Sequence, residues 1–341
     1  FLNNPQVSAS YSLPGGDRSS ASISQEISLS GEGWHARRAW SARVASGEAW
    51  LQRSHLEVAA ETRLAYIDAV VASGRVQLAE DGVELIERLH HAVTRQNEEG
   101  EASALEVRLA GLAKVHATSE LLAARETQST ALRVLAAYTG RVVSSENLAS
   151  DPAAIVPEPS DGTAAERSDV VAVRESVRAA EAGLRRQRAA SLPVVGVGAA
   201  VNVEDGQSFV GPTVSMTLPI FGRNQSGRTA AKGELDVAEA MLLSVSAVAE
   251  TEKETATVRA REAQEVAASM NRDPVADAKS ALAGVEAGYL AGEIDLPSTV
   301  LLQREILDGQ SAAIELLGRI AAANLDLMLV TEDPALLGGA Q

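Results

Sequence analysis

One segment has the residue types and spacing of a phosphate-binding loop. Residues 222–229 read Gly-Arg-Asn-Gln-Ser-Gly-Arg-Thr, and glycine-rich loops between a strand and a helix cradle nucleotide phosphates with backbone N–H groups. However, Arg228 stands where this motif requires Lys, and the equivalent junction in the first half of the chain, residues 31–35, has no such loop. We therefore interpret residues 222–229 as a connection from a strand to a helix.

A second glycine pattern, Gly196-Val197-Gly198, begins like a dinucleotide-binding loop. Val201 stands where the third glycine of that loop belongs, and without it the backbone cannot approach a pyrophosphate closely. We expect these small residues to line a strand.

Residues that catalyse reactions or bind metals are sparse. The chain has no cysteine, which excludes thiolate metal sites, disulfides and a cysteine nucleophile. The five histidines lack the spacing of metal ligands on one helix, and the adjacent pair points to different helix faces. These histidines are His35, His55, His90, His91 and His116. No Ser/His/Asp group or pair of catalytic carboxylates stands out, so we predict no enzymatic activity, no cofactor and no metal site.

Composition narrows the class of protein. The 341 residues carry a net charge of -16, which argues against binding nucleic acid, because that requires a basic face. Aromatic residues make up only 3% of the chain, whereas alanine is abundant and 22% of residues are charged. This balance favours long helices packed closely side by side over a compact globular core.

Two segments alternate between apolar and polar residues, as strands do. Residues 5–30 place Val7 and Tyr11 on one face, and the turn Pro14-Gly15-Gly16-Asp17 interrupts them. Residues 191–218 repeat the pattern around a turn at 204–207. Both segments predict β-hairpins whose arms of about ten residues are apolar on one face and carry Ser and Thr on the other.

The apolar period changes to that of a helix outside the hairpins. Two parallel stripes with a spacing of seven run along residues 34–97, which predicts a helix with neighbours on both sides. The first stripe contains Leu64, Val71, Leu78 and Leu85, and the second contains Ala69, Val76 and Val83. Further helices are expected at 105–138, 168–190, 229–270, before Gly292, and 297–330.

Glycines mark two sharp reversals between these helices, at Gly100 and Gly292. A helix hairpin commonly uses glycine because one residue must adopt a positive φ. In the second reversal, Asp295 can cap the returning helix, with Pro297 in its first turn. The need for a turn and a helix cap is enough to explain these residue types without any binding partner. Alternatively, the exposed residues of the two reversals form a surface that a partner recognises.

The two halves of the chain resemble each other. The segments beginning at Pro5, Ser24 and Gly100 match those beginning at Pro193, Thr217 and Gly292, with offsets between 188 and 193. We infer a duplicated unit of about 190 residues. The second copy has a helix before its hairpin, but the first copy has no such segment before Pro5, so we expect about 30 residues or more, and any signal peptide, to be missing from the start.

The hairpins have the length and alternation of membrane-spanning strands. Four strands cannot close a barrel, and an open sheet edge in lipid would leave N–H and C=O groups unpaired. Three copies would supply twelve strands, enough to enclose a lumen. The expected fold is therefore an α+β membrane protein: a trimeric transmembrane β-barrel with four strands per protomer, continued by a long α-helical barrel. The residues expected to face lipid are Val7, Tyr11, Ile23, Val197, Val214 and Met216. The alternative is a soluble α+β protein whose hairpins pack on its own helices.

Several segments, in this order on an internal repeat, resemble the TolC-like outer-membrane efflux proteins, and most closely their heavy-metal cation efflux branch. They are residues 192–196, 218–225, 99–107 and 288–296, with Gln303-Arg304 completing the last. The resemblance covers nearly the whole chain. It implies a homotrimer in the outer membrane of a Gram-negative bacterium, extending into the periplasm. It also implies a periplasmic adaptor that docks at the helix tips and joins an inner-membrane pump.

The resemblance also implies roles for particular residues. The predicted adaptor-docking tips are Gly100, Glu101, Ala102, Ser103, Gly292, Glu293, Ile294 and Asp295. Family members often close the periplasmic end with acidic side chains at positions matching Ser298 and Leu301, and this chain departs from that pattern. Glu293, Asp295 and Glu305 are the nearest acids that could form such an aperture. They could equally be ordinary solvated charges.

These interpretations divide the chain into consecutive segments. They are a first hairpin (1–33), a first long helical hairpin (34–140), a connector (141–167), a helix (168–190), a second hairpin (191–226), a second long helical hairpin (227–331) and a tail (332–341). The predicted function is a passive export duct for small solutes, in particular heavy-metal cations, in contact with outer-membrane lipid. A scaffold without a pore, or a duct for drugs or secreted proteins, is the alternative.

Overall fold

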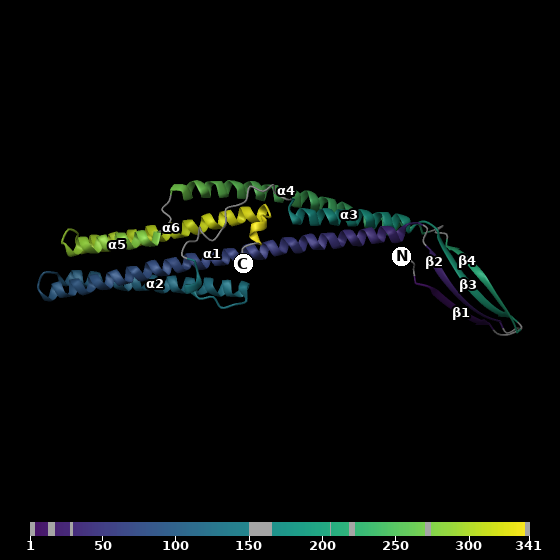
Figure 1. The fold of residues 1–341 in the computed structure, drawn as a ribbon, viewed down its shortest axis with the longest axis horizontal. Helices are drawn as coiled ribbons and strands as arrows, with labels where there is room; N and C mark the ends of the chain where they lie inside the picture. The colour runs from purple at the N-terminus through teal and green to yellow at the C-terminus, as the bar shows by residue number, and fades with distance from the viewer. Residues whose placement is uncertain are drawn as a thin grey trace. The chain divides into compact units, whose positions relative to one another are not determined.

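The structure is a computed structural model of the chain, shown in Figure 1. It describes residues 4–12, 18–27, 30–149, 166–204, 206–217, 222–269 and 274–337. The chain forms two compact units, Phe1–Arg53 with Glu166–Ala249 and Ser54–Ala165 with Glu250–Gln341. The predicted first turn, most of the predicted connector, residues 218–221 and the end of the tail lie outside the described residues.

The first unit contains a four-stranded antiparallel sheet with the strand order β1-β2-β3-β4 (Figure 1). Its strands are β1 (Gln6–Ser12), β2 (Arg18–Ile27), β3 (Val194–Glu204) and β4 (Gln207–Thr217). Both predicted hairpin pairings are confirmed. In addition, β2 pairs with β3 along ten residues, which joins the two hairpins into one sheet. Among the described residues, therefore, the outer edges of the sheet, along β1 and β4, are unpaired.

The register separates the two faces of the sheet by polarity. Val7 lies opposite Ile23, and Val197 opposite Val214, so these side chains share one face. By the same alternation, all six residues predicted to face lipid lie on that face. They are well exposed, with Val7 and Val214 both at 76%. Within the described part of this unit, therefore, no helix covers these six side chains.

Hydroxyl groups cover much of the opposite face. The Oγ atoms of Ser8 and Ser22 are 2.8 Å apart, as are those of Ser10 and Ser20. One large apolar side chain stands among the predicted Ser and Thr residues of this face. Phe209, opposite Asn202 in the register, lies on this face with 57% of its surface exposed.

Three helices continue the first unit beyond the sheet: the start of α1 (Glu32–Glu98), α3 (Ser168–Ala189) and the start of α4 (Gln225–Ser269). Ser46 of α1 and Ser176 of α3 bring their Oγ atoms to 3.0 Å. α4 begins before the predicted Thr229, because Asn224 adopts a positive φ of 49° and its carbonyl accepts a bond from the Arg228 N–H at 3.0 Å.

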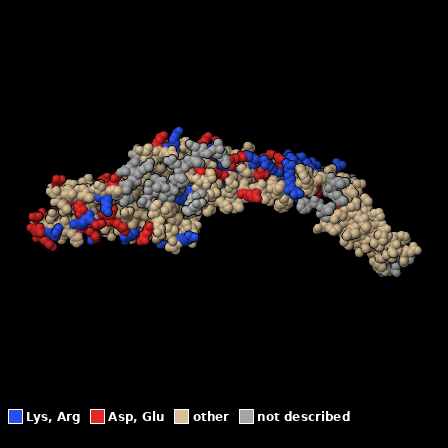
Figure 2. Space-filling view, viewed as in Figure 1, with Lys and Arg blue, Asp and Glu red and all other residues tan. Residues whose placement is uncertain are grey.

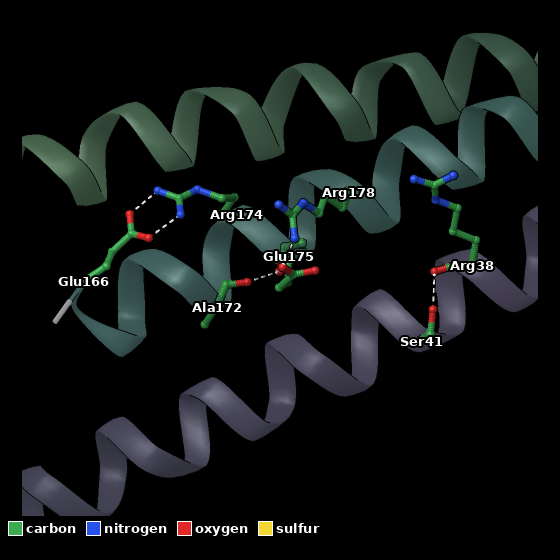
Figure 3. A network of polar contacts seen from close by, with 8 residues as sticks. Arg38, Ser41, Glu166, Ala172, Arg174, Glu175 and Arg178 are labelled. Carbon is green, nitrogen blue, oxygen red and sulfur yellow. Dashed lines mark hydrogen bonds and ion pairs between the residues drawn. The ribbon is translucent and has the colours of Figure 1, made fainter.

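Ion pairs link residues within α3 and just before it, and Figure 3 shows some of them. Arg174 forms a bidentate pair with Glu166, and Arg178 pairs with Glu175 on the same helix. At the start of α3, the buried Arg167 and Asp169 pair at 2.6 Å. Burial alone raises the pKa of Asp169, but the hydrogen bonds and charge of Arg167 outweigh it and hold that pKa below its usual range.

The second unit is helical and contains the rest of α1 and α4 together with α2 (Ala104–Thr139), α5 (Pro274–Leu290) and α6 (Leu296–Val330). Two short 3-10 helices, η1 (Ser145–Asn147) and η3 (Pro334–Leu336), lie in its connecting segments. The predicted positions of these helices are confirmed to within a few residues. None of the helices in the described ranges is both long and apolar enough to cross a membrane.

The two apolar stripes of α1 contact different neighbours, as predicted. Leu78 and Leu85 are buried against α5 and α6, whereas Ala69 packs against Leu135 of α2. The first stripe does not extend as far as predicted, because Leu64 is 40% exposed. The helix thus has close neighbours on both sides in this unit.

Small residues allow α1 and α6 to approach each other. A Cβ atom added at Gly318 of α6 would lie only 2.6 Å from Cγ2 of Val71 on α1. Val71 is β-branched and therefore restricted at χ1, so it cannot turn aside easily. Gly309, on the same helix, has no atom within 4 Å of the equivalent position.

We predict opposite effects for alanine at these two glycines. Gly318→Ala should destabilise the protein, because overpacking costs about 1–3 kcal/mol and the better helix propensity of Ala returns only about 0.5–1 kcal/mol. Gly309→Ala should stabilise it by about 0.5–1 kcal/mol. Thermal unfolding in detergent would check this, and a higher melting temperature for Gly318→Ala would contradict the close packing.

Candidate functional site at two helix reversals

The first reversal follows the end of α1. The Glu101 N–H donates to the carbonyl of Gln96 at 2.7 Å, and the Gly100 N–H donates to that of Asn97 at 3.1 Å. Gly100 has a φ of 82°, which confirms the predicted left-handed position. This pair of bonds is the Schellman arrangement that satisfies the last carbonyls of a helix.

The returning helix α2 begins with a capping box. The Glu106 N–H donates to Oγ of Ser103 at 3.2 Å, and the Ser103 N–H donates to Oε2 of Glu106 at 2.6 Å. Ser103 was predicted as a tip residue, whereas Glu106 was not. The signal was available, since Ser followed three residues later by Glu is the sequence signature of this box.

The second reversal repeats the geometry of the first. The Glu293 N–H donates to the carbonyl of Gly288 at 2.9 Å, the Gly292 N–H donates to that of Tyr289 at 3.0 Å, and Gly292 has a φ of 73°. Asp295 caps α6 by accepting a bond from the Ser298 N–H at 3.0 Å. The predicted cap is confirmed, with a proline in the first turn of α6.

Contacts bring the two reversals together into one surface, here called the tip. The Tyr289 hydroxyl donates to Oε1 of Gln96 at 2.9 Å. Val93, Ala110 and Leu296 form a buried cluster beneath, against which Ala102 packs. Glu101, Ser103, Glu293 and Asp295 are exposed, whereas Ala102 and Ile294 are half-buried. Some of the eight predicted residues are therefore exposed and available to a partner, whereas Ala102 and Ile294 are partly buried in the turns.

The tip is acidic. Figure 2 shows red side chains concentrated at this end of α1 and α2, and the sequence there includes Glu98, Glu99, Glu101 and Glu106. Hydrogen bonds from Ser103 lower the pKa of Glu106, and those from Ser298 lower the pKa of Asp295. These two carboxylates therefore stay charged well below neutral pH.

The three predicted aperture acids do not lie together within one chain. Glu293 and Asp295 belong to the tip, whereas Glu305 lies ten residues further along α6, about 15 Å away at 1.5 Å per residue. Glu305 is exposed, as are Ser298 and Leu301. A single chain thus places negative charge at two separate positions along α6, one at its start and one about three turns further on.

The other motifs lie in regular elements. Residues 225–229 are helical and do not form a loop that could wrap a phosphate, while Gly196 and Gly198 lie in β3, as predicted. In the described ranges, no group of three or more His, Asp or Glu could hold a metal ion.

Comparison with known proteins identifies the family. The profile of a family described as outer membrane efflux protein matches residues 161–331, which is half of the chain. No match was found among curated proteins.

Solved structures of outer-membrane channels share the fold. The structures of CusC, of VceC from Vibrio cholerae and of the CmeC channel from Campylobacter jejuni align with 97%, 98% and 97% of this chain and with 83%, 87% and 77% of their own. Their TM-scores are 0.78, 0.75 and 0.73, at sequence identities of 16%, 17% and 16%. The mostly helical architecture with one small antiparallel sheet is therefore that of these channels.

We predict that acid opens the tip. A carboxylate with a lowered folded pKa stabilises the fold above its unfolded pKa, and the stabilisation is lost as pH falls through the folded pKa. Cleavage by pepsin near Gly100 and near Gly292 should therefore accelerate as the pH falls through the lowered pKa values of Glu106 and Asp295.

Asp295→Asn provides the control, because Asn caps a helix but does not titrate. In this variant, cleavage near Gly292 should become less sensitive to acid than cleavage near Gly100, which is the internal reference. Equal acid sensitivity at both reversals of the variant would contradict a role for the Asp295 carboxylate.

Proposed function

The chain belongs to the outer membrane efflux protein family, and from this we propose that it is the outer-membrane component of a tripartite pump, serving as a passive export duct. Family members are efflux channels of the outer membrane, not enzymes, and the chain is accordingly an outer-membrane protein that extends into the periplasm. The energy for export would come from an inner-membrane partner.

The sheet is the observation that carries this proposal. It is apolar and exposed on one face, covered with hydroxyl groups on the other, and open along β1 and β4. Lipid cannot satisfy the N–H and C=O groups of an open edge. Three copies, each pairing its β4 with the next β1, would close a barrel of twelve strands with the hydroxyl groups inside.

Exposed apolar residues on the helices of the first unit also support a trimer. Their spacings of four and seven residues place them along one side of each helix. On α1 they are Trp40, Val44 and Leu51, and on α4 they are Val237, Met241 and Val248, with exposed fractions between 50% and 69%. Exposed apolar rows of this kind mark contacts with another protein surface.

The particle mass in mild detergent tests the assembly, and we expect a trimer. Val44→Asp should shift the particle toward monomers, since it buries a charge at the proposed interface. Gln52→Asp, which adds the same charge at another exposed position of α1, should leave the trimer intact. A native monomer that is stable without detergent would support the scaffold alternative instead.

We assign the two long helical hairpins, 34–140 and 227–331, to the periplasm and the two β-hairpins, 1–33 and 191–226, to the membrane. The equivalent bonding of the two reversals supports a duplicated unit. We also propose that the tip docks a periplasmic adaptor through its exposed residues, with Gly100 and Gly292 fixing the turns. Glu293, Asp295 and Glu305 from three copies would then form rings of acids around the periplasmic aperture, where substrate enters the duct.

Heavy-metal cations are the proposed substrate. The chain carries a net charge of -16, and acids at the tip would attract cations. The tip and strand segments that resemble the heavy-metal branch support the same class. Drugs and secreted proteins are the other candidates for a wide, wet channel.

Growth of a deletion strain tests substrate and docking together. Restoring the native gene should restore growth on heavy-metal salts, whereas Glu101→Lys with Glu293→Lys should lower the tolerated metal concentration several-fold by reversing the charge of the tip. Asp295→Ser keeps the cap without the charge and shows whether that carboxylate takes part.

The outcomes separate the two proposals. Rescue against drugs but not metals would contradict the substrate. Full rescue by the double lysine variant would contradict docking through these glutamates. Particle mass measured on the same variants would show that assembly is intact.

A further inference from the structure

Basic residues gather where the helices of the first unit begin and end next to the sheet. The segments 32–43, 185–188 and 223–232 contain nine Lys or Arg and one Glu, a net charge of +8 in a chain of net charge -16. Figure 2 shows blue side chains concentrated over the end of α3 beside the sheet. We call these residues the basic collar: Arg37, Arg38, Arg43, Arg185, Arg186, Arg188, Arg223, Arg228 and Lys232.

Side-chain contacts bring the three segments together. Arg186 of α3 pairs with Glu32 of α1 at 3.2 Å, and Asn224, just before α4, donates to Oε1 of Gln187 at 2.6 Å. Only four residues separate β2 from α1, and four separate α3 from β3. Connections of this length span at most about 18 Å, so the collar lies close to the end of the sheet.

Most of the collar is free to bind a partner. All nine side chains are exposed. Arg185 and Arg186 pair with glutamates, and the guanidinium groups of Arg38 and Arg43 lie over the rings of Trp34 and Trp40. The other five have no carboxylate partner in the part of the chain that the structure describes: Arg37, Arg188, Arg223, Arg228 and Lys232.

Helix stability does not explain the charges at the start of α4. Cations suit the C-terminus of a helix, which accounts for the arginines that end α3, but they are unfavourable near an N-terminus. Arg223 and Arg228 flank the N-terminus of α4, Lys232 follows one turn later, and the first turn has no acidic residue. These three charges therefore oppose the helix dipole and require another reason.

We propose that the basic collar binds the phosphate head groups of anionic phospholipids where the sheet leaves the membrane. The sheet presents its apolar face beside the collar, and Trp34, 59% exposed, has the amphipathic ring typical of a membrane interface. Clustered Lys and Arg next to a bilayer attract anionic lipids. Since the helices extend into the periplasm, these lipids belong to the periplasmic leaflet. The proposal requires the outer-membrane location but not the trimer.

Calorimetric titration of the full chain in a neutral detergent tests the proposal. The probes are dioctanoyl-phosphatidylglycerol, dioctanoyl-phosphatidylcholine and inorganic phosphate. We expect the native chain to bind the glycerol lipid at least ten-fold more tightly than the choline lipid, and the preference to weaken as salt is added.

Variants locate the effect. Replacing Arg223, Arg228 and Lys232 by Gln should lower the ratio of the two lipid affinities at least ten-fold. The helix should stay folded, because the removed charges oppose its dipole. Replacing Arg95, Arg108 and Arg141, three exposed bases of the second unit, removes equal charge and should leave the preference unchanged.

Three results would overturn the proposal. The first is equal affinity for both lipids, and the second is full competition by inorganic phosphate. The third is an unchanged lipid preference in the variant that lacks Arg223, Arg228 and Lys232, provided that circular dichroism shows its helices intact. A monomeric particle mass would contradict the trimer while leaving the lipid result in force.

Discussion

The unpaired edges of the sheet are the constraint on which the rest of the structure depends. β1 and β4 each expose a row of backbone groups, and in a bilayer no water can satisfy them. A helix of the same chain could cover such edges in a soluble protein. Here the apolar face beside them is exposed and suited to lipid, which leaves no place for a covering helix. Pairing with another copy leaves both the face and the edges satisfied. Under the proposed assembly, association between copies is a requirement of the strand chemistry, and the helices must be compatible with it.

The helices meet this requirement by dividing their surfaces. In the second unit, α1 buries Leu85 and Ile86 against its own chain, and glycine at position 318 lets α6 approach. In the first unit, Val44 and Leu51 of the same helix remain exposed. One long helix thus packs within the chain along the part that carries its two stripes and leaves apolar side chains exposed along another part, which we propose as a surface for association.

Local patterns predicted most elements, because alternation and heptad spacing are properties of neighbouring residues. The pairing of β2 with β3 was not predictable, since it joins Ile23 to Ala199 across the whole first helical hairpin. The early start of α4 was missed because Gly227 is a poor helix former, and only the positive φ of Asn224 sets the boundary. At the tip, turns and one cap were predicted. The contact between Tyr289 and Gln96 was not, because it depends on how two distant hairpins pack.

Charges that oppose a local preference are informative about function, since the helix that carries them gains no stability from them. Glu106 and Asp295 stand at helix N-termini, where the dipole favours them and capping alone explains their presence. Glu98 and Glu99 stand at the C-terminal end of α1, where the dipole disfavours them, just as Arg223 and Arg228 are disfavoured at the start of α4. Neither pair is explained by the stability of its own helix. This is why we propose that the acids at the tip and the bases of the collar make contacts outside the fold, with a partner protein in one case and with a lipid surface in the other.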